Sequence, residues 1–298
     1  FLARDSDAWL SPIITKGNKL FNSASGEEFR IRGIAYAPCP NAGELAGHVW
    51  ALHIGVIKDL GVNTIRLYSI NPILSHDKFM CAYSEAGIYA LTPLAASFKD
   101  EQVISHLLLC PFKCANCVIV EAQPPSCYPD SLFTRAQIIY NAFAVYDITL
   151  GFSVADKLNF LTKYDEQGTT TAPCAKAFLR DTRSYAYSCI DATRPVPISI
   201  NIADVIPRDE WPYYYDCTLE DDENTRAGWI GFNTYVECGS LNHTSYAQAA
   251  GLKILMQDFI HAAYARPVMF GEFGCNWAPT RSTAGKTSAR STTRSRCG

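Results

Sequence analysis

The sequence has 298 residues, of which 48% are hydrophobic and 18% are charged, and its formal net charge is −3. These proportions describe a globular protein that buries a sizeable core. Because no basic face is evident and no run of about 18 apolar residues occurs, we expect neither a nucleic-acid partner nor a membrane-spanning helix.

Short apolar bursts with β-branched residues predict seven strands. In chain order they cover residues 29–37, 62–70, 86–94, 148–155, 196–203, 228–235 and 267–274. Helical patterns lie between several of them, at residues 48–61, 131–146, 174–188 and 245–265. This alternation predicts an α/β fold with a parallel sheet. Polar residues at the carboxyl ends of the strands favour a (β/α)8 TIM-barrel-like fold, incomplete at the last strand because only seven strands are found.

The predicted domain organisation is simple. One barrel domain is expected over residues 1–276, and it contains a cysteine-dense insertion at residues 107–127 with neither a helical nor a strand period. Residues 277–298 form a basic, Ser/Thr-rich tail without an apolar burst. We expect this tail to be disordered.

The segment RPVMFGEFGCN ends an apolar strand on a carboxylate, Glu272, which stands between two glycines. A carboxylate at the carboxyl end of a barrel strand is a candidate nucleophile or general acid/base, and retaining glycosidases need two of these. The alternative is a buried glutamate paired with Arg66. Tyr36, Tyr68 and Tyr235 are expected on the same rim, where tyrosine rings can stack on sugars; singly, each could instead be ordinary amphipathic capping.

Several blocks carry a resemblance to a known family: residues 61–77, 86–89, 231–239 and 267–276, in matching order. The chain resembles the fungal β-1,3-glucanosyltransferases, family 72 of the glycoside hydrolases, which elongate and branch cell-wall glucan. The resemblance implies a secreted barrel protein that acts on β-1,3-glucan by a retaining two-carboxylate mechanism. We expect a monomer that needs neither a metal nor another cofactor. Such proteins are often lipid-anchored, but no anchor signal is evident in the sequence.

Carried over by position, Glu272 matches the family's nucleophile, and Arg66, Tyr68 and Tyr235 match residues around it. The family's acid/base glutamate follows LGF in a Gly-Asn-Glu motif, but here Lys157 occupies that place and Asp156 precedes it. An ammonium with an ordinary pKa near 10.4 is a poor general acid at neutral pH.

Two consequences are expected at this position. Lys157 should form an ion pair with Glu272 and lower its pKa. Asp156 should turn its side chain to the other face of the strand, because side chains alternate along a strand. It could replace the lost acid only if the strand slipped or ended early. Two further family positions are altered, at Ala37 and Pro93.

The 12 cysteines favour a secreted protein, in which they form disulfides. The resemblance implies a Cys238–Cys275 bridge, and it makes Cys39–Cys81 and Cys217–Cys297 candidate pairs. Six cysteines have no family counterpart: Cys110, Cys114, Cys117, Cys127, Cys174 and Cys189. The first four of these have a spacing that could hold zinc, although the second half is not a paired Cys-x-x-Cys. Asn242 begins a glycosylation sequon.

Three functions therefore stay open. The first is glucan remodelling with chemistry impaired by the loss of the acid/base glutamate. The second is a non-catalytic β-glucan-binding protein that keeps Tyr68 and Tyr235 as a sugar-stacking rim. The third is a relic without a ligand.

Overall fold

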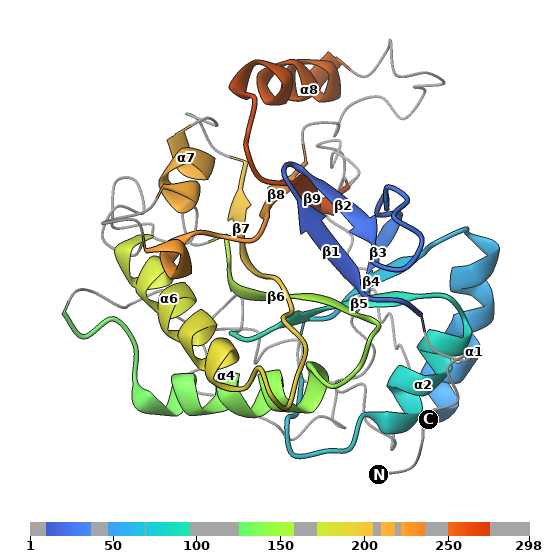
Figure 1. Cartoon of the computed structure of the whole chain (residues 1–298). Coiled ribbons are helices and arrows are strands. Elements are labelled where there is room, and N and C mark those ends of the chain that lie inside the picture. Colours follow the sequence, from blue (N-terminus) through green and yellow to red (C-terminus); the bar gives the residue numbers. More distant parts are fainter. Residues whose placement is uncertain are drawn as a thin grey trace, which may run out of the picture.

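The computed structural model describes residues 10–36, 47–68, 70–95, 125–157, 172–204, 210–217, 222–235 and 250–274. Seven parallel strands form a nearly closed barrel in the order β3-β4-β5-β6-β7-β8-β9 (Figure 1). Their bounds are β3 (Gly33–Ala35), β4 (Thr64–Arg66), β5 (Tyr89–Pro93), β6 (Thr149–Asp156), β7 (Ile198–Ala203), β8 (Ile230–Thr234) and β9 (Val268–Phe273). All seven predicted strands are confirmed, and so is the parallel barrel-like sheet. Within the described residues, β3 and β9 are its two unpaired edges.

Helices surround the barrel (Figure 1). They are α1 (Gly47–Asp59), α2 (Asp77–Glu85), α4 (Asp130–Phe143), α6 (Ala172–Ser188), α7 (Glu210–Asp216) and α8 (Ala250–Ala262), with a 3-10 turn η2 (Glu223–Thr225). The four predicted helices correspond to α1, α4, α6 and α8. Sequence reasoning missed α2 and α7, which have only 9 and 7 residues and are too short to show a clear helical period. No helix in the described segments is long and apolar enough to cross a membrane.

A short antiparallel hairpin, β1 (Ile13–Lys16) and β2 (Lys19–Asn22), precedes the barrel and was not predicted. Gly17 in its turn has φ +56°, a conformation that glycine adopts without a Cβ clash. A second glycine, Gly61, has φ +68° two residues after the last residue of α1, a conformation that commonly ends a helix.

Amide side chains and glycines share the interior of the barrel. A Cβ added to Gly231 would lie 1.8 Å from Oδ1 of Asn201, and one added to Gly271 would lie 2.5 Å from Oδ1 of Asn233. Both asparagines are buried. The glycines of β8 and β9 therefore leave the space that these two amides occupy.

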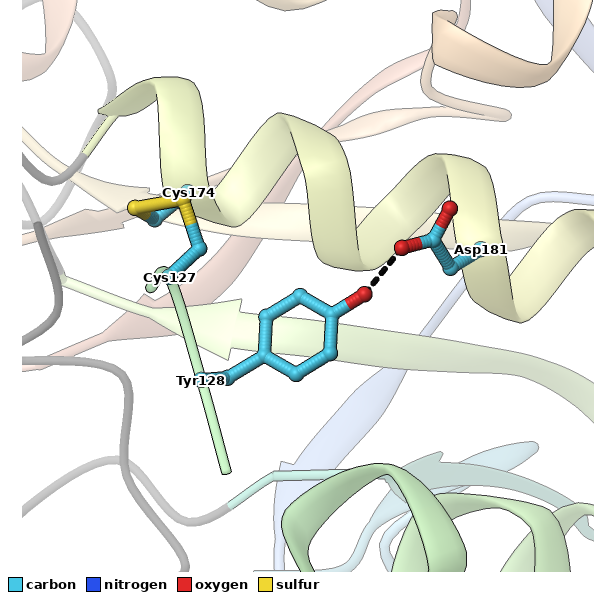
Figure 2. Close-up of a disulfide and its surroundings, with 4 residues drawn as sticks. All are labelled: Cys127, Tyr128, Cys174 and Asp181. Carbon is cyan, nitrogen blue, oxygen red and sulfur yellow. Dashed lines mark hydrogen bonds between the residues drawn. A yellow bond between two sulfur atoms is a disulfide. The ribbon is translucent and has the colours of Figure 1, made fainter. Parts of the chain in front are cut away.

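One disulfide joins Cys127, just before α4, to the buried Cys174 on α6. Figure 2 shows it next to a second link between the same segments, in which the hydroxyl of Tyr128 donates to the carboxylate of Asp181. Because the sulfur of Cys127 is bonded to Cys174, the four-cysteine zinc arrangement considered from spacing is not formed.

None of the cysteine pairings implied by the resemblance is observed among the described residues. Among the described residues Cys81, Cys189 and Cys217 are free thiols, so the candidate pairings of Cys81 and Cys217 are not formed in this structure. The thiol of Cys217 instead donates to the Tyr214 carbonyl, at 3.0 Å. Several sequence-based expectations lie outside the described residues: Cys39, Cys238, Cys275, Cys297, Asn242, most of the 107–127 insertion and the 277–298 tail.

Candidate active site

Glu272 lies on β9 with its side chain about 9% exposed, and four side chains contact its carboxylate. The hydroxyl of Tyr68 donates to Oε1 at 2.9 Å, and Nη1 of Arg66 lies 3.3 Å from the same oxygen. The hydroxyl of Tyr235 donates to Oε2 at 2.5 Å, and Nζ of Lys157 lies 2.5 Å from it. These residues come from the carboxyl ends of β4, β6 and β8. The predicted ion pair between Lys157 and Glu272 is confirmed.

Arg66 connects this carboxylate to a second one. Its Nη2 lies 2.8 Å from Oδ2 of Asp156, and its Nη1 donates to the carbonyl of Gly271 at 2.8 Å. Asn233 donates to Oδ1 of Asp156 at 2.5 Å. The site thus holds two cations, Arg66 and Lys157, against two anions, Asp156 and Glu272, and its charge is balanced.

The predicted orientation of Asp156 is wrong. Its side chain is buried and paired with Arg66, which also contacts Glu272, the partner of Lys157, so it joins the cluster instead of turning to the opposite face of the strand. The strand ends at Asp156, its pairing with β7 is irregular between Ser153 and Asp156, and Lys157 has φ +54°. Because a left-handed residue breaks the alternation of an extended strand, two successive side chains can reach one cluster.

The surroundings keep Glu272 ionised. Burial alone would raise its pKa, but hydrogen bonds from Lys157 and Tyr235 and the charge of Arg66 outweigh burial and lower the pKa below its usual value. The pKa of Tyr235 is raised, by burial first and then by its hydrogen bond to Glu272. Burial likewise raises the pKa of Tyr68, although the charge of Arg66 opposes the shift. Both phenols are therefore neutral donors to a carboxylate.

Tyr36 does not belong to this cluster, contrary to prediction. Its hydroxyl lies 2.9 Å from Nδ1 of His53 on α1, and its ring centroid is 6.0 Å from that of Tyr83 on α2. Tyr36 follows the end of β3 and packs between the barrel and these helices. A position at a strand end sets the height of a side chain in the barrel but not the direction in which it points.

Sequence reasoning missed Asn201 and Asn233 as members of the site's supporting structure. Asn233 holds Asp156, and Asn201 donates to Oγ of Ser153 at 3.0 Å. The signal was present, because each is an amide in a strand whose other residues are mostly apolar and all buried. A buried amide in such a strand needs a partner inside the barrel.

A parallel barrel with a buried carboxylate at the carboxyl ends of its strands defines a (β/α)-barrel protein whose polar cluster lies at the rim where such barrels carry their sites. The comparison with family models gives the same result, since the glucanosyltransferase model of glycoside hydrolase family 72 matches residues 3–287. The chain therefore belongs to the glucanosyltransferase family, which confirms the resemblance seen in its motifs.

Individual relatives agree with this assignment. The chain is 30% identical over 269 residues to 1,3-beta-glucanosyltransferase gas4 of Schizosaccharomyces pombe, covering 89% of this chain and 52% of that protein. It is 29% identical to 1,3-beta-glucanosyltransferase gel2 of Aspergillus fumigatus, and the match covers 89% of this chain and 51% of that protein. The structure of Saccharomyces cerevisiae Gas2p in complex with laminaritriose and laminaritetraose matches this fold with a TM-score of 0.71 at 28% identity. The match covers 91% of this chain and 55% of that chain. The chain thus spans about half the length of these relatives.

Proposed function

We propose that this chain binds β-1,3-glucan at the rim around Glu272 and that its glucanosyltransferase chemistry is impaired. Membership of the family supports the ligand, as does the structural likeness to Gas2p bound to laminari-oligosaccharides. Tyr235, about 45% exposed, offers a ring edge and face to a sugar beside the carboxylate. An extracellular, cell-wall setting is part of this proposal, and the Cys127–Cys174 disulfide supports it.

The observation that carries the impairment is the 2.5 Å contact between Nζ of Lys157 and Oε2 of Glu272. A retaining reaction requires one oxygen of the nucleophile to attack the anomeric carbon. Here each oxygen already has two donors, and Lys157 would have to be displaced before attack. The ammonium also stands where the family has its acid/base carboxyl group.

Asp156 is the nearest substitute for the lost acid, and its contacts argue against that role. One oxygen accepts from Asn233 and the other is paired with Arg66. Both oxygens are thus engaged by donors and directed at these two side chains, so neither is placed to protonate a leaving oxygen. Because the side chain reaches the cluster, residual turnover through Asp156 is the second candidate function, and the same experiment tests it.

The test is incubation with a reduced β-1,3-linked pentasaccharide, with product lengths read by mass spectrometry. We expect the wild-type protein to form no products that differ in length from the pentasaccharide. A column carrying the immobilised protein should nevertheless retain the sugar. The K157E variant should form such products at least about 100-fold faster than K157Q, since a positioned general acid contributes about 100- to 10,000-fold. K157Q is the matched control because it removes the ion pair without supplying a carboxyl group.

Two results would contradict the proposal. A product series from the wild-type protein that vanishes in Glu272→Gln would show that the chemistry is intact, and loss in Asp156→Asn would then identify the acid. Failure of the column to retain the sugar would exclude glucan binding and leave a relic without a ligand.

A further inference from the structure

A cavity of about 460 Å³ lies at the end of the barrel opposite to Glu272. It is lined by residues of α7, by Ile230 at the start of β8 and by the segment that joins α8 to β9. In the sheet, Ile230 pairs with Val268 whereas Asn233 pairs with Glu272, so the cavity and the Glu272 site are at different ends of the same strands. Its volume is within the range of small-ligand sites.

The cavity presents polar groups that have no partner in the described part of the chain. Tyr213 is about 75% exposed, and neither its hydroxyl nor the carboxylate of Glu210 takes part in a hydrogen bond among the described residues. Tyr264 supplies a second aromatic ring to the lining. A concave site that combines aromatic rings with a few polar groups is typical of ligand pockets.

Arg266 is a fixed donor at the edge of this cavity. Its Nε lies 3.2 Å from Oδ1 of Asp216 and its Nη2 lies 3.2 Å from Oε2 of Glu223. Its Nη1 donates to no group within the described segments. The same two carboxylates also pair with Arg226, so two arginines and two carboxylates form a cluster without net charge. The cluster orients the guanidinium of Arg266 and makes it a poor site for an anion and a suitable donor to a neutral hydroxyl.

We propose that this cavity is a second binding site for a neutral oligosaccharide, and that its ligand is β-1,3-glucan. The identity of the sugar rests on the proposed function above. The ring of Tyr213 would stack on a pyranose, the carboxylate of Glu210 would accept from sugar hydroxyls, and Nη1 of Arg266 would donate to a sugar oxygen.

The placement of the two sites has a consequence for polymer binding. Ile230 and Asn233 are three residues apart, or about 10 Å along the strand, and the buried amides of Asn201 and Asn233 lie in the barrel interior. A short oligosaccharide cannot thread through this interior, so it binds each site independently. A long or multi-chain glucan can occupy both sites and gains avidity from doing so.

The experiment is calorimetric titration with laminaripentaose, combined with retention on insoluble β-1,3-glucan. The wild-type protein should bind about two equivalents. Tyr213→Ala and Tyr235→Ala should each bind about one, and Glu210→Gln should weaken the second site about tenfold. Each single-site variant should also be retained less well on the insoluble glucan. Tyr187→Ala, which truncates a half-exposed tyrosine on α6, is the matched control and should behave as wild type.

The outcomes separate this proposal from the proposed function. One equivalent that is lost in Tyr235→Ala but unchanged in Tyr213→Ala and Glu210→Gln would overturn the second site and leave the first intact. One equivalent that is lost only in Tyr213→Ala would support the cavity and overturn binding at Glu272. No binding would overturn both. Because Tyr213 and Glu210 are exposed, these variants should keep the wild-type thermal unfolding midpoint.

Discussion

The balanced charge cluster allows a quantitative prediction for Arg66→Met. This substitution keeps much of the side-chain volume but removes the cation that contacts both Asp156 and Glu272. The side chains of Arg66, Asp156 and Glu272 are only 10%, 4% and 9% exposed, so water does not replace the lost charge. Breaking a buried ion pair by removing one partner costs about 3–5 kcal/mol. Lys157 still compensates Glu272, and we therefore expect about 3 kcal/mol.

The assay is urea unfolding at pH 7 and again at about pH 3.5. A loss of about 3 kcal/mol is a large part of the 5–15 kcal/mol typical of a domain. In thermal unfolding, the same loss lowers the midpoint temperature of a chain of this size by about 6–12 °C. The loss should be smaller at low pH. The charge of Arg66 helps to lower the pKa of Glu272, so without Arg66 this pKa rises, and the neutral carboxyl group needs no counter-charge.

The matched control is Arg226→Met. Arg226 also contacts two carboxylates, at 2.8 Å in Glu223 and 3.5 Å in Asp216, but these groups are 29–61% exposed. Exposed pairs are typically worth 0.2–1 kcal/mol, so about 1 kcal/mol or less should be lost. An Arg66→Met protein that loses no more than this control, or loses the same amount at both pH values, would refute the reasoning.

Three further predictions follow from the structure. The lowered pKa of Glu272 means that its ionised form stabilises the folded state fully above about pH 4.5, and that this contribution is lost as the pH falls through the folded-state pKa. The difference in urea midpoint between wild type and Glu272→Gln should shrink over that interval. Gly231→Ala should cost about 3 kcal/mol in the same assay, because its Cβ would lie 1.8 Å from Oδ1 of Asn201. Replacing Cys127 and Cys174 by alanine should cost about 4 kcal/mol, the chain-entropy value for a separation of 47 residues.

Each of these has its own control. If Glu272→Gln parallels wild type at every pH, the carboxylate is not the group that titrates. Gly55→Ala on α1 has open space around the added Cβ and should stabilise the protein by about 0.5–1 kcal/mol; a similar gain in Gly231→Ala would mean that the barrel interior is loosely packed. Reduction of the disulfide without any change in the unfolding midpoint would contradict the third prediction.

Residue patterns along the chain predicted the barrel strands and the carboxylate at the end of the last one. The seven apolar segments correspond to seven strands, because a strand of a parallel sheet is buried on both faces and therefore consists mainly of apolar residues. Glu272 was recognised as a charge at the end of an apolar strand, whereas Lys157 was singled out only through the resemblance to the family. Carboxyl ends of parallel strands meet on one rim, so residues at those ends are expected to lie together.

The directions of side chains and the contacts between distant groups could not be predicted from these patterns. The left-handed backbone at Lys157 brings Asp156 into the cluster, whereas Tyr36 turns away toward α1 and α2. The Cys127–Cys174 disulfide joins segments that are far apart in the chain. The cavity beside Tyr213 is likewise lined by residues that are distant in sequence. The physical reason is that residue patterns record burial along one element, while contacts between elements depend on their packing in three dimensions.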